Sequence, residues 1–399
     1  MATVTSQAAT GGLPLDPLEV AETLQPLERA TMLPPAAFAD PAVLAWELDN
    51  LFGGWVCMGH VSAVAERGAY LMREIGPTSV FAIGGEDGVP RAFLNSCRHR
   101  ASRLLTETTG SVRKRVQCPY HAWSYDLEGN LVAAPHMDGV EGFDRSCNGL
   151  IEIRSAVVGG LVLIDLSGAA PDPGEHVGDL RPMFERYRLA ELRPGGATSY
   201  EVGANWKGIV ENYNECLHCP AVHPELNALS DYRSGTSMPG TGNWCGGSMT
   251  LNEHAETMST DGGHRPSIEG LSERDRRSVY YFALLPNALV SLHPDYVMLH
   301  TVWPVAVDRT EVSCQWFFEP ETIAREDFDA SDAIGFWDMV NRQDWRVCEL
   351  SQLGVGARGY VAGRYSADEG DVHAFDTLVA ERYMAALREG ADLASAGSS

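Results

Sequence analysis

The sequence contains no hydrophobic run long enough to cross a membrane. Its most apolar stretches, such as GGLVLIDL, are far shorter than the ~20 residues that a membrane-spanning helix requires. The opening residues, MATVTSQAATGGLPLDP, lack both the basic and the apolar segment of a secretory signal. The nine cysteines are odd in number and have no framework spacing, so we expect reduced thiols and metal ligands. These features predict a cytoplasmic protein with no membrane partner.

Basic residues are also scarce. Thirty Lys and Arg stand against 54 Asp and Glu, which gives a formal charge of −24. Such a surface repels phosphate backbones, so the composition argues against nucleic-acid binding. A partner with a basic face could dock on it, although a solvated acidic surface is the simpler interpretation. The chain also shows no internal repeat, no Rossmann fingerprint and no flavin motif.

The 399 residues divide by composition into four parts. Residues 1–40, rich in alanine, proline and threonine, predict a flexible N-terminal lead-in. Residues 41–165 predict an all-β domain preceded by a helix. Residues 175–390 mix strands with helices and predict a second domain, an antiparallel sheet flanked by helices. Residues 391–399 predict a disordered tail, and the fold class is α+β.

A few elements can be placed more closely. DPAVLAWELDNLF has helical periodicity, with Asp40 as its N-cap. The short β-rich runs that follow alternate with Gly, Asp and Asn turns, which is typical of a small antiparallel sheet or barrel. DLEGNLV predicts a hairpin with its turn near Gly129 and Asn130. Near the C-terminus we expect a long helix from Ser331 to Leu353, ended by Gly354.

Two mixed cysteine–histidine pairs form the first candidate site. They are Cys97 with His99 and Cys118 with His121, and 18 residues separate the pairs. Zinc accepts two cysteines and two histidines, but zinc fingers usually keep the cysteines together and the histidines on a later helix. Here each pair lies between β-like runs, so two facing loops can each offer one sulfur and one nitrogen. In a Rieske [2Fe–2S] cluster, two cysteines hold one iron and two histidines hold the other.

CRH…CPYHAWSYDLEGNL resembles the Rieske domain of the oxygenase (alpha) component of Rieske non-haem iron oxygenases. The gap is about one residue longer than usual in that family, and Ala101 and Ala122 stand where it usually has glycine. Ser102 and Ser124 are neighbouring small residues, so the extra cysteines of respiratory Rieske proteins are absent. The resemblance implies that the four Cys and His residues bind one cluster. Trp123 would help to shield that cluster from water.

A second candidate site lies in ENYNECLHCPAVHP. On a helix, Glu215 and His218 would share a face, and Pro220 would break the helix so that His223 could turn back towards them. Two imidazoles beside an acid are most of a 2-His-1-carboxylate triad, which binds Fe(II) and leaves positions open. The ordinary alternative is helix-end chemistry, but a nearby Rieske motif favours the iron interpretation.

The same resemblance covers this stretch and implies roles for its residues. His218 and His223 would be iron ligands. Glu215 would be the catalytic conduit acid, bridging His218 to a cluster histidine of the neighbouring subunit, His121 by analogy. QDWRVCE resembles the segment that supplies the carboxylate ligand, for which we select Asp344. Asp338 would be a surface acid that faces elsewhere, and Glu349 would support the site or cap a network.

The resemblance implies an oxygenase that activates O2 at a mononuclear Fe(II) with electrons from the cluster. A separate NAD(P)H-dependent reductase would supply them, directly or through a ferredoxin, and the oxygenase would be a homotrimer. ENYNECLHCPAVHPEL and LLPNALVSLHPDYVM most resemble the glycine-betaine and quaternary-amine branch, although Leu217 stands where many relatives have tyrosine. We therefore expect N-demethylation of a quaternary amine such as glycine betaine.

Aromatic residues in the second domain could cage a quaternary ammonium by cation–π contact or line a pocket for an aromatic ring. Most aromatic residues serve as ordinary core, however. Aromatic ring mono- or dioxygenation is therefore the alternative activity. A plain Rieske electron carrier and a zinc-stabilised binding module are alternatives of other classes, which the second His and acid cluster and the mixed pairs disfavour.

Overall fold

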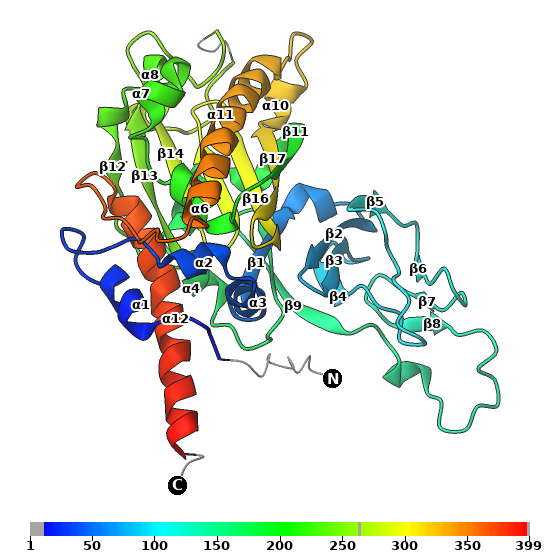
Figure 1. Ribbon diagram of the computed structural model, residues 1–399. Coiled ribbons are helices and arrows are strands. Elements are labelled where there is room, and N and C mark those ends of the chain that lie inside the picture. The colour runs from blue at the N-terminus through cyan, green and yellow to red at the C-terminus, as the bar shows by residue number, and fades with distance from the viewer. Residues whose placement is uncertain (1–11, 262–264, 397–399) are drawn as a thin grey trace. The chain divides into compact units, whose positions relative to one another are not determined.

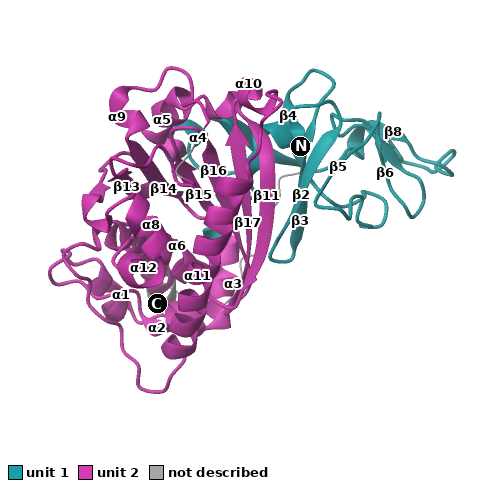
Figure 2. Ribbon diagram, turned by 90° about the horizontal axis from the view of Figure 1, so that it is seen from above, with its two compact units in different colours: residues 1–7, 50–176 teal, residues 8–49, 177–399 magenta. Residues whose placement is uncertain are grey.

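The computed structural model describes residues 12–261 and 265–396, and these residues form two compact units. Among them, unit 1 holds residues 50–176 and unit 2 holds residues 12–49 and 177–396 (Figure 2). Both units contain antiparallel sheets, and most helices belong to unit 2, which confirms the predicted α+β class. Within the described ranges, no helix is both long and apolar enough to cross a membrane.

Unit 1 is built on a seven-stranded antiparallel sheet (Figure 1). Its strand order is β1-β10-β9-β4-β3-β2-β5. Strands β3 and β10 consist mostly of apolar residues and are largely buried. The seven strands are β1 (Trp55–His60), β2 (Ala69–Ile75), β3 (Thr78–Gly84), β4 (Pro90–Leu94), β5 (Thr109–Ser111), β9 (Glu152–Val158) and β10 (Leu161–Asp165).

A second, three-stranded sheet in unit 1 carries the predicted hairpin. Its strands are β6 (Val116–Gln117), β7 (Ser124–Tyr125) and β8 (Leu131–Ala133). Between β7 and β8 the Asp126 carboxylate accepts hydrogen bonds from the backbone and side chain of Asn130, at 2.7 and 3.0 Å. Gly129 has a φ of +83°, a conformation that favours glycine. The turn therefore lies where the sequence predicted it.

Unit 2 contains a seven-stranded antiparallel sheet of order β11-β17-β16-β15-β14-β13-β12. In β17, buried and partly exposed residues alternate, whereas β15 is buried throughout. The strands are β11 (Arg193–Val202), β12 (Thr236–Ser237), β13 (Trp244–Thr250), β14 (Ser278–Leu284), β15 (Ala288–Leu292), β16 (Val297–Ala306) and β17 (Arg309–Phe318).

Helices cover this sheet: α6 packs on β14 and β16, α11 on α6 and β11, and α12 on β13 and α6 (Figure 1). The α-helices are α1 (Pro17–Thr23), α2 (Pro35–Ala39), α3 (Pro41–Asn50), α4 (Pro173–Val177), α5 (Leu180–Arg186), α6 (Trp206–Tyr213), α7 (Cys219–Val222), α8 (Pro224–Leu229), α9 (Glu273–Arg276), α10 (Pro320–Ile323), α11 (Ser331–Val355) and α12 (Gly370–Ala396). Short 3-10 helices are η1 (Val61–Val64), η2 (Arg145–Cys147), η3 (Leu189–Glu191) and η4 (Tyr232–Ser234).

Helix α3 belongs to unit 2, although the sequence assigned it to the first domain. Asp40 accepts a hydrogen bond from the Ala42 N–H at 2.8 Å, as expected of its N-cap. The assignment changes because of Glu47, which is fully buried and pairs with Lys207 of α6 at 2.6 Å. Its other oxygen accepts a hydrogen bond from the Trp206 indole at 2.8 Å. A buried ion pair of this kind joins two elements that hydrophobic periodicity alone cannot connect.

Both ends of the chain are more ordered than the sequence suggests. Residues 12–40 are not a flexible lead-in, because α1 packs against α12 and the Val20 side chain is fully buried. Residues 1–11 of that segment lie outside the described residues. The predicted tail also begins too early, since α12 continues to Ala396, while residues 397–399 again lie outside the described part. Helix α11 ends at Val355, two residues beyond the expected Leu353.

Candidate functional site

Two loops of unit 1 present the mixed cysteine–histidine pairs in nearly identical backbone frames. In the first loop the Cys97 N–H donates to the Ser102 carbonyl at 2.9 Å, and in the second the Cys118 N–H donates to the Trp123 carbonyl at 2.8 Å. Ala101 and Ala122 each donate back to the carbonyl of the loop's cysteine, at 2.9 and 3.1 Å. Each loop is therefore a closed turn, and it directs the side chains of its cysteine and its histidine to the same side.

The side chains of these loops are sorted by type. Cys97 and Cys118 are both buried and hydrogen-bonded to each other, so the two sulfurs adjoin. The His99 and His121 rings lie beside each other, with centroids 4.7 Å apart. The His121 Nδ1 is buried and has no hydrogen-bond partner within the described residues. Two sulfurs on one side, two imidazoles on the other and an orphaned ring nitrogen fit a Rieske [2Fe–2S] cluster.

Two buried aromatic residues close the space around the loops. The Trp123 ring stacks on His99 at a centroid distance of 4.8 Å and an interplanar angle of 8°. The Tyr125 hydroxyl lies 3.3 Å from the Cys97 sulfur and accepts the Arg98 N–H at 3.0 Å. Hydrogen bonds to cluster sulfurs and exclusion of water are two factors that set the potential of an iron–sulfur centre. Tyr125 was not singled out in the sequence, although it follows the CPYHAWS motif directly.

A second site lies in unit 2, where His218, His223 and Asp344 converge. Their potential ligand atoms all lie within 4.8 Å of one another. The Nε2 atoms of His218 and His223 lie 3.2 and 2.7 Å from the Asp344 Oδ1. His223 has an exposed fraction of only 1%. Two imidazoles and one carboxylate form a triad that suits Fe(II), and the residues selected from the sequence are thus brought together.

The outer nitrogens of both imidazoles are held by side-chain oxygens. The His218 Nδ1 lies 2.5 Å from the Glu215 Oε1, and the His223 Nδ1 lies 2.7 Å from the Gln343 Oε1. Each contact requires a hydrogen on Nδ1, so the Nε2 atoms of both rings are the ones that face Asp344. Gln343 was missed in the sequence, although it directly precedes Asp344 in the QDW segment.

The charges of the triad support a cation. Burial lowers the pKa of His218, but hydrogen bonds to Asp344 and Glu215 outweigh it and raise that pKa to about 9. Burial also works against ionisation of Asp344, yet the two histidines hold its pKa below the usual value. A proton therefore occupies the position that a divalent metal would take, and metal binding would displace it.

The local fold around Glu215 differs from the expected helix. Helix α6 ends at Tyr213, and Pro220 stands in the first turn of the next helix, α7. Glu215 and His218 therefore lie on the intervening turn, where the Glu215 Oε2 accepts the Leu217 N–H at 2.5 Å. The prediction that both residues share one helix is wrong, although the turn brings them equally close.

Cys216 and Cys219 form a disulfide in this turn, which corrects the expectation that all cysteines outside the metal sites are reduced. Their Cα atoms are 5.0 Å apart, within the range that a disulfide can span. The bond encloses His218. The other seven cysteines are free.

The remaining acids of α11 lie away from the triad. Asp338 accepts hydrogen bonds from the Tyr200 hydroxyl and the Arg342 Nε, both at 2.9 Å, so it faces elsewhere as predicted. Glu349 was expected to support the site or to cap a network, and it accepts the Gly203 N–H at 3.3 Å, which fits the second role and not the first. Asp338 precedes Asp344 by six residues and Glu349 follows it by five. Neither spacing is a whole number of helical turns of about 3.6 residues, so both acids lie on other faces of α11 than Asp344.

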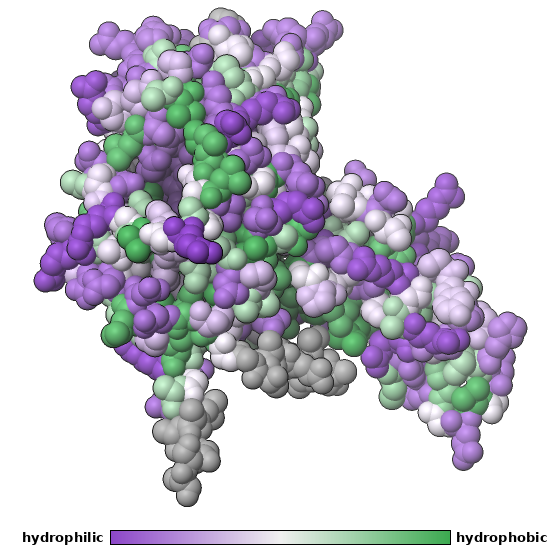
Figure 3. Space-filling view, viewed as in Figure 1, coloured by the Kyte–Doolittle hydropathy of each residue, from purple (hydrophilic) through white to green (hydrophobic). Residues whose placement is uncertain are grey.

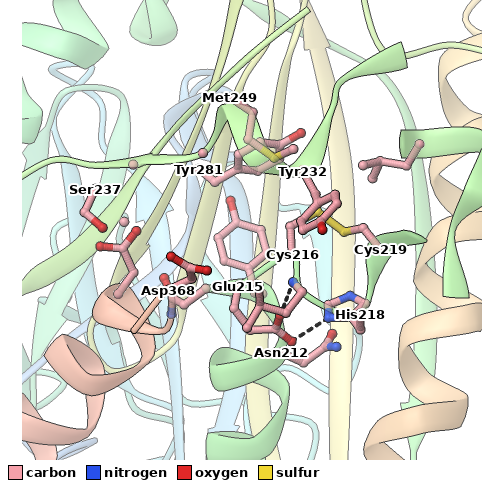
Figure 4. A pocket seen from close by; sticks show the side chains of 18 of the residues that line it. Asn212, Glu215, Cys216, His218, Cys219, Tyr232, Ser237, Met249, Tyr281 and Asp368 are labelled. Atoms are coloured by element: carbon pink, nitrogen blue, oxygen red, sulfur yellow. Dashed lines mark hydrogen bonds and ion pairs between the residues drawn. A yellow bond between two sulfur atoms is a disulfide. The ribbon is translucent and has the colours of Figure 1, made fainter. Parts of the chain in front are cut away.

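A cavity of about 390 Å³ opens beside the triad, and His218, His223 and Asp344 line it (Figure 4). Tyr213, Tyr281 and Trp337 form one connected aromatic wall, because ring centroids lie 5.9 Å apart for the tyrosine pair and 6.3 Å apart for Tyr281 and Trp337. The Tyr281 hydroxyl is buried without a hydrogen-bond partner among the described residues. The cavity thus offers a substrate aromatic faces next to a metal site.

A Rieske-like pair of loops in one unit and a 2-His-1-carboxylate triad in the other define the class of Rieske non-haem iron oxygenases. Residues 54–144 match the family model of the Rieske [2Fe-2S] domain, and residues 189–385 match that of the ring hydroxylating alpha subunit (catalytic domain). The chain belongs to this family of oxygenase alpha subunits, which carry a Rieske cluster and a mononuclear iron.

Its relatives include enzymes named for quaternary amines. The carnitine monooxygenase oxygenase subunit of Acinetobacter pittii is 34% identical over 354 residues, which cover 85% of this chain and 90% of the relative. The glycine betaine monooxygenase oxygenase subunit of Pseudomonas aeruginosa is 28% identical over 396 residues, 91% of each chain. A crystal structure of a quaternary ammonium Rieske monooxygenase with L-carnitine has the same fold, with a TM-score of 0.76, 24% identity and coverage of 92% of this chain and 99% of that one.

Proposed function

We propose that the protein removes a methyl group from a quaternary amine, the class of substrate that includes glycine betaine. One oxygen atom of O2 enters a C–H bond of an N-methyl group, and the other leaves as water with two electrons and two protons. The resulting N-hydroxymethyl group is lost as formaldehyde. The observation that carries the proposal is the cavity, where the aromatic wall of Tyr213, Tyr281 and Trp337 adjoins the triad.

His218, His223 and Asp344 would hold the mononuclear iron. When bound, that iron supplies the chemistry of O2 activation, since a facial triad leaves positions for O2 beside the substrate. The protein residues orient the parts: Glu215 and Gln343 fix the imidazole tautomers, at 2.5 and 2.7 Å. Tyr281 and Trp337 would bind the ammonium group by cation–π contact and hold an N-methyl group towards the triad.

Cys97, His99, Cys118 and His121 would hold the cluster that delivers the electrons one at a time. Oxygenase components of this family depend on a separate reductase, and no Rossmann fingerprint occurs in this chain. In the proposed homotrimer, Glu215 would bridge His218 to His121 of a neighbouring subunit. Glu215 is suited to this because its side chain keeps an exposed fraction of 16% while it contacts His218.

The substrate class is tested with iron-loaded protein and a surrogate reductase. Quaternary amines and aromatic acids are offered in parallel, while O2 uptake and formaldehyde are followed. N-demethylation predicts formaldehyde in a 1:1 ratio to O2 with at least one quaternary amine. O2 uptake coupled to ring-hydroxylated product, without formaldehyde from any amine, would replace the proposal with aromatic oxygenation.

The bridging role of Glu215 has its own test. Glu215→Gln keeps the shape of the side chain but loses the negative charge that favours an imidazole N–H on each side. We expect the cluster to remain reducible by the reductase while turnover falls by about a hundredfold, a typical loss for a residue that orients a metal ligand. Near-normal turnover in this variant would discard the bridge.

A further inference from the structure

The wall of the cavity opposite the metal triad is acidic. Asp368, exposed in the turn before α12, and Asp371, half-buried in the first turn of α12, both line the cavity. Ser237 of β12 lines it beside them and is hydrogen-bonded to Asp371. Figure 4 shows Ser237 and Asp368 on one side of the cavity and His218 on the other. The acids and the triad therefore lie on different sides of the same cavity.

Neither acid is neutralised by the protein. Across residues 12–261 and 265–396, Asp368 and Asp371 form no ion pair. Acids are common in the first turn of a helix because they complement its dipole, and that alone would explain Asp371. It does not explain Asp368, which precedes the helix, nor why both carboxylates face a cavity that ends at a metal site.

One arginine, Arg233, lines the same cavity, and it is already paired with an acid. Arg233 has an exposed fraction of 75% and lies over the Tyr232 ring, with its guanidinium carbon 5.3 Å from the centroid. Its Nε is 3.4 Å from the carboxylate of Asp231. An exposed, paired guanidinium at the edge gives little attraction to a carboxylate inside the cavity.

The reacting N-methyl group must face the triad, so the remainder of the substrate determines what meets the acidic wall. A carboxylate there would lose its hydration and face two like charges, which disfavours binding. A hydroxyl or amino group would instead donate a hydrogen bond to a carboxylate, and such charge-assisted bonds are among the stronger ones.

Building on the proposed function, we propose that Asp368 and Asp371 select N-methylated cations whose far end donates hydrogen bonds, and reject those that end in a carboxylate. Both are specificity-determining residues, since they contact the substrate tail and not the reacting atoms. A quaternary ammonium alcohol fits this cavity better than glycine betaine or carnitine. Within the quaternary amines, the chain thus departs from the two relatives named above.

Choline and glycine betaine make a matched pair of probes, because they share a trimethylammonium group and differ at the far end. Each is titrated calorimetrically into iron-loaded protein under anaerobic conditions, so that binding is read without turnover. We expect choline to bind at least about tenfold more tightly, the size of one charge-assisted hydrogen bond. Glycine betaine binding equally or more tightly, or no choline binding at all, would overturn the proposal.

Two substitutions test whether Asp368 and Asp371 cause the preference for choline. Asp371→Asn and Asp368→Asn should each reduce the choline preference to about threefold or less by weakening choline binding or easing glycine betaine binding. Glu381→Gln serves as the control, because Glu381 is an exposed acid on α12 that does not line the cavity and should leave the ratio unchanged. A ratio that survives in both Asp variants would also overturn the proposal.

These outcomes are distinct from failure of the proposed function. Formaldehyde from glycine betaine, with choline bound weakly, would retain N-demethylation and refute the acidic selection. Tight choline binding without formaldehyde from any amine would retain the selection and refute N-demethylation.

Discussion

At the scale of single residues, Ala101 and Ala122 occupy matching positions in the two cluster loops. Both have left-handed backbone, with φ of 54° and 58°. That conformation is unfavourable for any residue with a Cβ atom, and glycine adopts it without cost. This explains why glycine is usual at these positions in the family, and shows that the loop geometry is retained here in spite of the substitution.

Replacing either alanine by glycine should therefore stabilise unit 1. We expect Ala101→Gly and Ala122→Gly each to raise the free energy of unfolding by about 1 kcal/mol. The backbone strain that glycine relieves in the folded state is worth more than the conformational entropy that glycine adds to the unfolded chain. Denaturant unfolding, followed by loss of cluster absorbance, measures the change. Ala69→Gly in β2 is the control and should destabilise, since Ala69 lies in a regular strand. Destabilisation by both loop variants would contradict the strain argument.

Spacing in the sequence was sufficient to group the four cluster residues and to pair His218 with His223, whereas Asp344 was selected through the resemblance of QDWRVCE to a family segment. The structure brings His218, His223 and Asp344 together. The sequence could not predict Gln343, since an amide that orients a ligand needs no particular spacing and contacts His223 across 120 positions. Gln343→Leu should retain the protein's fold and cluster, but its affinity for the mononuclear iron should fall by about tenfold or more. Metal analysis after mild chelation measures the loss, and undiminished iron would remove the orienting role.

At the scale of secondary structure, α6 is the central connection of unit 2. Its Lys207 pairs with Glu47 of α3, and Tyr383 of α12 also donates a hydrogen bond to Glu47. Its C-terminal end leads into the turn that holds Glu215 and His218. Periodicity predicted α3 and α11 well. It could not predict which unit α3 joins, because one buried ion pair decides that.

Lys207→Met should leave the Glu47 carboxylate buried without its cation. We expect a loss of about 3–5 kcal/mol in the free energy of unfolding of unit 2, since uncompensated buried charges are expensive. Tryptophan fluorescence during denaturant unfolding measures this. Arg181→Met is the matched control, because Arg181 forms an exposed i,i+4 pair with Glu185 and should change stability by less than about 1 kcal/mol. Equal effects of the two substitutions would contradict the account.

A second connection between α6 and α12 depends on a proton. Asp376 is fully buried, the Oε1 atom of Glu211 is buried as well, and the two carboxyl groups interact with each other. Burial raises the pKa of both carboxyl groups. The Tyr365 hydroxyl donates to the Asp376 carboxylate at 2.5 Å, and this hydrogen bond and the charge of Lys207 both favour the charged form of Asp376, but burial outweighs them. The folded state thus keeps a proton that the unfolded chain releases at lower pH, so stability falls as pH rises above the unfolded values.

Glu211→Gln replaces the protonated acid by a neutral amide and removes this titration. Between about pH 5 and about pH 8, the variant should lose less stability than the unaltered protein. Thermal unfolding across that range provides the measurement. A variant that follows the pH profile of the unaltered protein would show that the pair does not hold the proton.

At the scale of the whole molecule, hydrophilic side chains cover most of the face seen in Figure 3, with hydrophobic ones in separate groups. This agrees with the formal charge of −24. Composition and pattern predicted the two-unit division and the α+β class, because each unit has its own run of strands. The order of residues 12–40 was not predictable, since it depends on long-range packing of α1 on α12 and of α2 on α11.

The central claim is that one chain holds two iron centres of different kinds. Iron, zinc and acid-labile sulfide are measured in protein produced with ample iron, together with the visible spectrum, for the unaltered chain and for Asp344→Ala. The account predicts red-brown protein with about three irons and two sulfides per chain, and loss of about one iron with an unchanged cluster spectrum in the variant. Colourless protein, zinc in place of iron, or a variant that keeps all its iron would contradict it.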